Sequence, residues 1–534
     1  YLFALVAGDL GCLKDHFVTQ SGRRVALEIF GRKGHESRFA YAMQALKNSM
    51  RWDEERFGLE YDLDVFMIVV ADDFNMGAME NKGLNIFNAH YILADAATAT
   101  DKDFANVEAV VGHEYFHNWT GNRITCRDWF QLSLKEGLTV YRDQEFSADM
   151  GSRAVKRIED VIRLRTHQFA EDAGPMAHAV RPRSYLAIDN FYTLTIYEKG
   201  SEVIRMIETL IGREAFRKGM DKYFELFDGQ AVTTDDFVRA MEIASGRDLT
   251  QFKNWYDQAG TPKLKVQTEW KDDTYSITLE QSCDPSPGQE TKKPYHMPIA
   301  IGLLGRDGRD LIPTRVLELT ESKQKFEITG IKEKPILSLL RGFSAPVRVD
   351  FEQSVEELAF LMAHDSDAVA RWEATQTLMI KTLLARIAHS PSAGKLEESL
   401  LAALEPLLKD PFADPAFVSF MLQLPSEAYV AQFLTTVDPE LAFRSRESLL
   451  KAIAKHHRQH FEGIYGKLST QDLSGLSQKA MGLRSLLNTS LMYLCLSDDV
   501  RDLEKALVQR RTAKDMTTEL GALEALNRSL HPAR

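Results

Sequence analysis

The sequence predicts a multidomain α+β protein in which a mostly helical domain is followed by a small β-sandwich and then by stacked helices. The chain has 534 residues, whereas single hydrophobic cores stop growing near roughly 250–300 residues. Apolar and polar residues alternate over residues 1–35 and 261–350, while residues 36–260 and 351–534 show helical spacing. Length and changing periodicity together indicate about three or four domains.

Composition excludes several classes of protein. Hydrophobic residues make up 44% and charged residues 27%, which is typical of a globular protein and not of a disordered one. The net charge of −12 argues against broad nucleic-acid binding. No apolar run approaches the roughly 20 residues that a membrane helix needs. The four cysteines are widely separated and form no CxxC pair, which favours a reducing, cytoplasmic compartment.

The first residues predict strands. Val25, Leu27 and Ile29 alternate with polar positions, and the apolar, β-branched run 63–71 suits a buried strand. The opening segment YLFALVAGDL lacks the basic region of a signal peptide. Because the chain begins with Tyr1 and not Met, we expect a fragment whose first segment is a strand of a larger sheet.

Residues 261–350 predict the β-sandwich. Candidate strands begin at Leu264 and Tyr275 on either side of a turn at 271–274, and others cover 299–304, 315–319, 325–328 and 347–351. Short strands separated by turn residues are typical of a sandwich. From about residue 351 the chain is rich in Leu, Ala, Glu and Lys at helical spacing and is punctuated by prolines, which predicts stacked helices to its end.

The strongest chemical signal is an HExxH motif at residues 113–117. Thr100 and a carboxylate three residues later resemble a capping box, so we expect a helix that ends near Gly121. On a helix, His113 and His117 lie one turn apart and can hold one tetrahedral zinc ion. Glu114 lies beside the metal, where it can deprotonate a zinc-activated water. The alternative is a pair of surface histidines around an ordinary glutamate.

Zinc needs a third protein ligand, for which Glu136 is the candidate. A second helix starting near Ser133 could present Glu136 to the metal. The alternative is that Ser133 and Glu136 form a capping box for their own helix. Asp143, two turns further along the same face, is either a hydrogen-bond acceptor for a ligand imidazole or a solvated carboxylate.

Residues 77–81 read Gly-Ala-Met-Glu-Asn, and together with HExxH and Glu136 they resemble the signature of the gluzincin zinc aminopeptidases. The runs 112–140 and 197–200 are most similar to the bacterial members of that family. The resemblance is dense over residues 1–260 and weaker afterwards. It implies a thermolysin-like catalytic zinc domain over 11–260, preceded at 1–10 by the end of an N-terminal β-domain. A β-sandwich domain would cover 261–350 and an incomplete helical domain 351–534.

The resemblance also implies roles for individual residues. Backbone groups of Gly77 and Ala78 would pair with an extended peptide by strand addition. Glu80 would bind the free α-ammonium of the substrate, which makes the enzyme an exopeptidase. Tyr197 would donate to the oxyanion of the transition state. Without the resemblance, Glu80 reads as a loop carboxylate and Tyr197 as a packed helix residue.

Met76 and Tyr192 match family positions that line the pocket for the first substrate side chain, where a thioether can adapt to different shapes. Otherwise both would be packing residues. The expected function is a monomeric zinc metallo-aminopeptidase of broad specificity that acts on peptides with a free N-terminus, without nucleic-acid or membrane partners. Each chain would hold one Zn²⁺.

Two other functions stay open. A branch of the same family opens lipid epoxides with the same metal triad, but Ala78 stands where that branch carries a second glycine. A non-catalytic helical scaffold would fit the long C-terminal region, although the intact metal and acid residues argue against it. We expect substrate capture and closure of the active-site chamber to depend on family segments before residue 1 and after residue 534.

Overall fold

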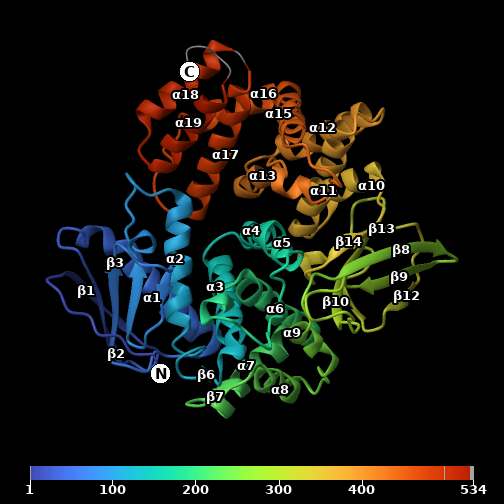
Figure 1. Ribbon diagram of the computed structural model, residues 1–534. Helices are drawn as coiled ribbons and strands as arrows, with labels where there is room; N and C mark the ends of the chain where they lie inside the picture. The colour runs from blue at the N-terminus through green and yellow to red at the C-terminus, as the bar shows by residue number, and fades with distance from the viewer. Residues whose placement is uncertain (1, 498, 530–534) are drawn as a thin grey trace.

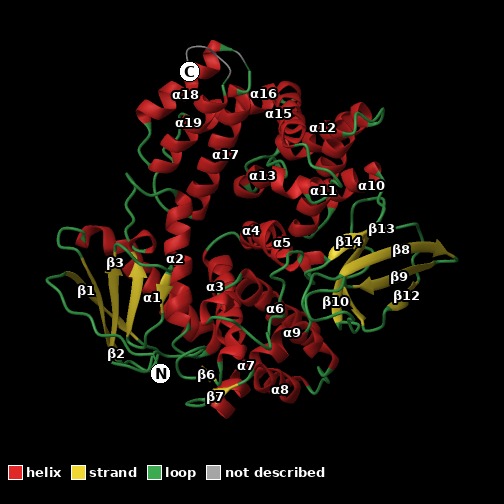
Figure 2. Ribbon diagram, in the orientation of Figure 1, coloured by secondary structure: helices red, strands yellow, loops and turns green. Residues whose placement is uncertain are grey.

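The computed structural model describes residues 2–497 and 499–529. Figure 1 shows an N-terminal sheet packed beside a helical body, a β-sandwich on the far side of that body, and a helical region above both. This arrangement confirms the predicted α+β multidomain class. Figure 2 shows that strands are confined almost entirely to the two flanks, whereas helices fill the centre and the top.

The N-terminal sheet has five strands in the order β1-β2-β3-β5-β4. Its strands are β1 (Gly11–Val18), β2 (Arg24–Gly31), β3 (Val65–Ala71), β4 (Ala78–Met79) and β5 (Leu84–Asn88). The alternating side chains Val25, Leu27 and Ile29 are fully buried, as their periodicity predicts. The prediction of a strand at the start of the chain was wrong: residues 2–10 form none. In the described chain no neighbouring strand is present to pair with their backbone groups.

A helical body follows the sheet along the chain, and its first helix lies in sequence between β2 and β3. Its helices are α1 (Ala40–Phe57), α2 (Asp101–Phe116), α3 (Leu132–Met150), α4 (Arg153–Arg163), α5 (Phe169–Asp172), α6 (Gly200–Ile211), α7 (Arg213–Phe227), α8 (Thr234–Ser245) and α9 (Asn254–Asp257). Two π-helical segments, η4 (Leu164–Gln168) and η6 (Thr195–Lys199), and a two-stranded sheet of β6 (Thr125–Cys126) and β7 (Ala231–Val232) complete it.

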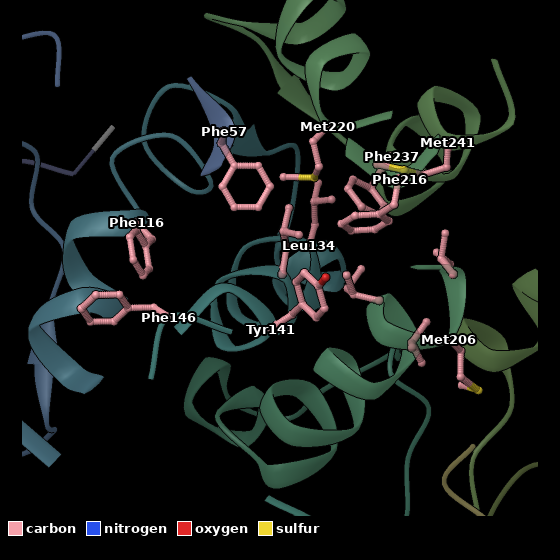
Figure 3. Close-up of a cluster of buried hydrophobic side chains, with 14 of the residues drawn as sticks. Phe57, Phe116, Leu134, Tyr141, Phe146, Met206, Phe216, Met220, Phe237 and Met241 are labelled. Atoms are coloured by element: carbon pink, nitrogen blue, oxygen red, sulfur yellow. The ribbon is translucent and has the colours of Figure 1, made fainter. Parts of the chain in front are cut away.

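The interior of this body holds α2 and α3 together. Figure 3 shows Phe116 of α2 and Phe146 of α3 within a cluster of buried aromatic, leucine and methionine side chains. The centroids of these two rings are 5.5 Å apart in an edge-to-face arrangement, which aromatic pairs favour. The two helices that carry the HExxH motif and Glu136 are therefore fixed by a continuous core.

The β-sandwich consists of a three-stranded sheet, β11-β10-β13, and a four-stranded sheet, β12-β9-β8-β14. Its strands are β8 (Lys263–Lys271), β9 (Thr274–Ser282), β10 (Met297–Leu304), β11 (Arg315–Leu319), β12 (Lys323–Thr329), β13 (Ile336–Leu339) and β14 (Arg348–Asp350). Asp272 and Asp273 both have positive φ, as a tight hairpin turn between β8 and β9 requires. Periodicity did not predict β13, which is only four residues long.

The C-terminal region is helical throughout its described part. It comprises α10 (Val355–His364), α11 (Ala368–Ile387), α12 (Ala393–Lys409), α13 (Pro415–Met421), α14 (Glu427–Ala431), α15 (Pro439–His456), α16 (Arg458–Leu468), α17 (Gln478–Cys495), α18 (Val500–Thr512) and α19 (Met516–Arg528). The buried Arg484 of α17 pairs with Asp101 at the first turn of α2, at an Nη2–Oδ1 distance of 2.6 Å. The helical region therefore docks on the N-terminal end of the helix that carries HExxH. Among the described helices, none has the length and apolar character needed to cross a membrane.

Candidate metal centre

The HExxH motif occupies the last turn of α2. The predicted capping box is present at the other end of the helix, where Thr100 and Asp103 bond each other's backbone N–H groups. The helix ends at Phe116, earlier than the predicted stop near Gly121. The guanidinium of Arg142 from α3 donates to the carbonyl of Phe116 at 2.9 Å, which satisfies a helix-end acceptor. His117 lies just after this end, still in a helical conformation.

Glu136 reaches the two histidines from α3. Its Oε2 atom lies 3.4 Å from Nε2 of His113 and 3.2 Å from Nε2 of His117. The alternative of a capping box is not what the structure contains, because α3 begins at Leu132 and Ser133 lies inside the helix. The residue before the helix, Gln131, makes no side-chain capping bond. Glu136 is therefore free to face the histidines.

Tyr197 joins the site because α3 and α6 approach each other closely. A Cβ atom on Gly137 would lie 2.8 Å from backbone of Gly200, and one on Gly200 would lie 3.1 Å from Gly137, so only glycines permit this contact. Gly137 follows Glu136, and Gly200 directly follows the π-helical segment η6, which contains Tyr197. The rings of Tyr197 and His113 are stacked with centroids 6.4 Å apart.

Hydrogen bonds to the histidines fix which ring nitrogens face inward. Nδ1 of His113 lies 2.7 Å from Asp143 Oδ2, and Nδ1 of His117 lies 2.8 Å from the carbonyl of Thr120. Both partners are acceptors, so each Nδ1 carries a proton and donates it, and Nε2 is the nitrogen that can offer a lone pair to a cation. These two Nε2 atoms are only 3.0 Å apart. Two lone pairs and a carboxylate oxygen thus converge on one point, and this donor set fits a divalent cation.

The separations agree with metal coordination. Bonds of about 2.0–2.1 Å to a tetrahedral ion place neighbouring ligand atoms about 3.3–3.4 Å apart, close to the 3.0, 3.2 and 3.4 Å found. The electrostatic environment also favours a cation at this point. Burial lowers the pKa of His113, but the carboxylates of Asp143 and Glu136 outweigh burial and raise this pKa well above its ordinary value. The centre is built to stabilise positive charge.

Glu114 lies beside the three converging donors. Its side chain is buried, and its Oε2 atom has no hydrogen-bond partner in the described chain. Burial, followed by repulsion from Glu80 and Glu136, raises the pKa of Glu114 to about 8. A buried carboxylate with a raised pKa and an open oxygen is suited to taking and returning a proton.

The strand β4 and Glu80 border the centre on the side of the sheet. β4 stands last in the strand order and pairs antiparallel with β5, so within the described residues its outer edge has no strand partner. Gly77 extends this pairing, since its carbonyl accepts from the N–H of Asn88 at 2.9 Å. Burial raises the pKa of Glu80, but His117 and Lys135 outweigh it, so the carboxylate is held ionised.

Lys135 is a site residue that the motifs did not reveal. It is buried, and its Nζ donates to Glu80 Oε1 at 2.6 Å and to Glu136 Oε1. The ammonium thereby bridges the carboxylate that faces the histidines and the carboxylate beside β4. Its neighbour Glu136 was the only available signal, because a lysine next to a predicted ligand is otherwise typical of a solvated helix face.

The two predicted pocket residues, Met76 and Tyr192, differ in their surroundings. Met76 is in the loop before β4 and is 49% exposed. Tyr192 is partly buried, and its ring centroid is 6.3 Å from that of Tyr197. Tyr192 therefore lies next to Tyr197, whereas neither residue has a recorded bond to the converging donors.

Comparison with protein families finds a match for each of the three parts of the chain. Residues 41–256 match the peptidase family M1 domain. Residues 260–352 match a domain of unknown function, DUF3458, described as having an Ig-like fold, and residues 355–534 match the DUF3458_C domain, described as ARM repeats.

Individual relatives agree with these matches. The chain is 47% identical to aminopeptidase N of Escherichia coli, covering 100% of this chain and 62% of that protein. It is 50% identical to aminopeptidase N of Caulobacter vibrioides, covering 98% and 61%. A crystal structure of Legionella pneumophila aminopeptidase A in complex with aspartic acid superposes with a TM-score of 0.87 at 30% identity, covering 97% of this chain and 59% of that one. The chain thus spans about three fifths of the length of these relatives.

Proposed function

We propose that this chain, whose residues 41–256 match the peptidase family M1 domain, is the metal-binding part of a zinc aminopeptidase, which releases N-terminal residues from peptides. The observation that carries the proposal is the convergence of two histidine lone pairs and a carboxylate next to an unpaired, buried glutamate. The relatives named aminopeptidase N support it through their identity over nearly all of this chain.

We assign the metal ligands to His113, His117 and Glu136. Two imidazoles and one carboxylate form a donor set that zinc uses in hydrolases, with a fourth position open. When bound, the ion supplies Lewis-acid activation of a water molecule and of the scissile carbonyl. Asp143 holds the ring of His113 in the tautomer that presents Nε2.

Glu114 is the proposed general base. Its unpartnered Oε2 accepts a proton from the attacking water and later returns it to the amine that leaves. A bound cation would lower the pKa of this carboxylate from about 8, so that it is ionised when substrate arrives. Tyr197 keeps its proton, because burial and the neighbouring Glu136 raise its pKa above the ordinary value. A neutral phenol can donate to the oxygen that gains charge in the transition state.

Substrate recognition is assigned to the edge of the sheet. The free edge of β4, with Gly77 and Ala78, can pair with an extended peptide. Glu80 then binds the α-ammonium of the substrate through charge-assisted hydrogen bonds, in place of part of its contact with Lys135. Because this anchor is fixed relative to the metal, cleavage falls one residue from the N-terminus. Met76 and Tyr192 would contact the first side chain.

We further propose that the protein acts as a monomer in the bacterial cytoplasm, with one zinc ion in this centre. The widely separated cysteines, free in the structure, suit a reducing compartment. Neither a lipid epoxide hydrolase nor an inactive scaffold is favoured, because the relatives are named as aminopeptidases and His113, His117 and Glu136 lie together in a group that could hold a metal ion.

Replacement of Glu114 by glutamine tests the proposal. The variant should keep its zinc, measured by elemental analysis, but lose about 10²–10⁴-fold in turnover of an alanine anilide, because a general base has been removed. Glu108→Gln, on the same helix, is the matched control and should retain both. Turnover by Glu114→Gln at the wild-type rate, or a wild-type chain that binds zinc but cleaves no aminoacyl anilide, would contradict the proposal.

A further inference from the structure

A second group of metal-ligating side chains lies in the C-terminal helical region. Glu405 of α12 faces His457, which stands between the end of α15 and the start of α16, and His460 in the first turn of α16. One ligand atom from each of the three residues lies within 4.8 Å of the other two. The donor set, two histidines and one glutamate, is the same as that of the first centre, although the residues belong to a different domain.

His457 presents an unpaired lone pair to this cluster. The residue is 1% exposed, and its Nε2 lies 3.0 Å from the carbonyl of Leu401, so Nε2 carries the proton and donates it. Its Nδ1 is therefore the lone-pair nitrogen of the neutral ring. That atom is buried and has no hydrogen-bond partner in the described chain, yet it lies 3.3 Å from Glu405 Oε2.

This pairing needs a cation between its members. A lone pair opposite a carboxylate is repulsive, and an unsatisfied buried acceptor costs about 1–3 kcal/mol. A proton on Nδ1 could remove the repulsion only through a hydrogen bond to Glu405. The structure contains no such bond, since Nδ1 has no hydrogen-bond partner although Glu405 Oε2 is 3.3 Å away.

The third side chain completes a coordination geometry. Nε2 of His460 lies 3.2 Å from Oε1 of Glu405, so the carboxylate stands between the two imidazoles. A tetrahedral zinc ion sets its ligand atoms about 3.3–3.4 Å apart, and each imidazole nitrogen lies about that far from one oxygen of Glu405: 3.2 Å from Oε1 for His460 and 3.3 Å from Oε2 for His457. Glu405 and His460 are 35% and 29% exposed at their side chains, which leaves an entry path and room for water as a further ligand.

We propose that Glu405, His457 and His460 form a second binding site for a divalent transition-metal ion, with zinc as the expected occupant. Imidazole nitrogens select zinc and its neighbours over magnesium or calcium, which prefer oxygen ligands. The ion would connect α12 to the junction of α15 and α16 and so stabilise the helical region. Lys409, whose Nζ lies 3.6 Å from Glu405 Oε1, would give up part of that contact.

The site can be counted directly. After dialysis of the full chain against zinc and removal of free metal, elemental analysis should give about two ions for the wild type and about one for His460→Ala or Glu405→Gln. The matched control is His456→Ala, which removes the exposed histidine next to the cluster and should leave about two. Both ligand positions are partly exposed, so these substitutions avoid the core that His457→Ala would disturb.

A variant of the first centre distinguishes the zinc ion bound there from the ion proposed for this site. In a Glu136→Gln chain that has lost the first ion, added zinc should still raise the melting temperature. In the double variant Glu136→Gln/His460→Ala, added zinc should no longer raise it. Activity of His460→Ala should equal that of the wild type. His460→Ala with as many ions as the wild type would overturn the proposal whether or not the first centre is an aminopeptidase site.

Discussion

Replacing Asp143 by alanine isolates the contribution of one hydrogen bond to the metal centre. The carboxylate of Asp143 accepts from Nδ1 of His113 at 2.7 Å, and both side chains are largely buried. A hydrogen bond to a charged group contributes about 1.5–3 kcal/mol, so its loss should weaken zinc binding by about 10- to 150-fold. Asparagine keeps a neutral acceptor at the same place and should cost about half of that free energy, or about 3- to 12-fold in affinity.

The assay is competition for zinc between the protein and a chelator of known affinity. Asp149→Asn is the matched control, because Asp149 is also on α3 but accepts from Trp52 and Arg56, away from the histidines. It should bind zinc like the wild type. If Asp143→Ala bound zinc as tightly as the wild type, the idea that this carboxylate positions His113 would fail. If the control lost as much affinity, the effect would belong to the stability of α3.

Three further predictions concern other parts of the chain. Tyr197→Phe should lower kcat by about 10²–10³-fold with little change in KM, as loss of one oxyanion donor does, and a change confined to KM would count against this role. Glu80→Ala should lower kcat/KM far more for peptides with a free N-terminus than for acetylated ones, whereas equal losses would refute anchoring of the amine. Arg205 and Arg153 outweigh burial and lower the pKa of Glu145 to about 2. The ionised carboxylate therefore stabilises the fold at pH values above about 4.5, and this stabilisation is lost as the pH falls toward 2. Glu145→Gln should cost about 3 kcal/mol at neutral pH in urea denaturation, and a deficit that does not shrink toward pH 2 would contradict the assignment.

The helices that carry the proposed ligands could be predicted from the sequence, but the way in which they pack together could not. The HExxH spacing places two histidines on one helix face whatever surrounds them, because helical periodicity is a local property. The competing interpretation of Glu136 as part of a capping box could not be excluded from residues alone, since it depends on where α3 begins. The structure puts that start at Leu132, two residues too early for Ser133 to act as a cap.

Tertiary packing accounts for most of what was missed. The strand expected at residues 2–10 depended on a partner strand, and alternation cannot reveal whether such a partner exists. The contact between Gly137 and Gly200 joins residues far apart in sequence, and it sets the spacing between Glu136 and Tyr197. Neither glycine carries any signal of its own, because a glycine in a helix is read as a weak point until its neighbour is known.

Lys135 shows why the charge of a site has to be considered as a whole. Glu80, Glu114 and Glu136 would repel one another in a buried space, and the ammonium of Lys135 reduces that repulsion where it touches two of them. The remaining negative charge is what a divalent ion and a substrate ammonium can neutralise together. Without a bound metal ion, the carboxylates of the centre carry more negative charge than Lys135 can neutralise. Substrate and metal should therefore reinforce each other's binding, and zinc removal should weaken binding of a free-amine inhibitor.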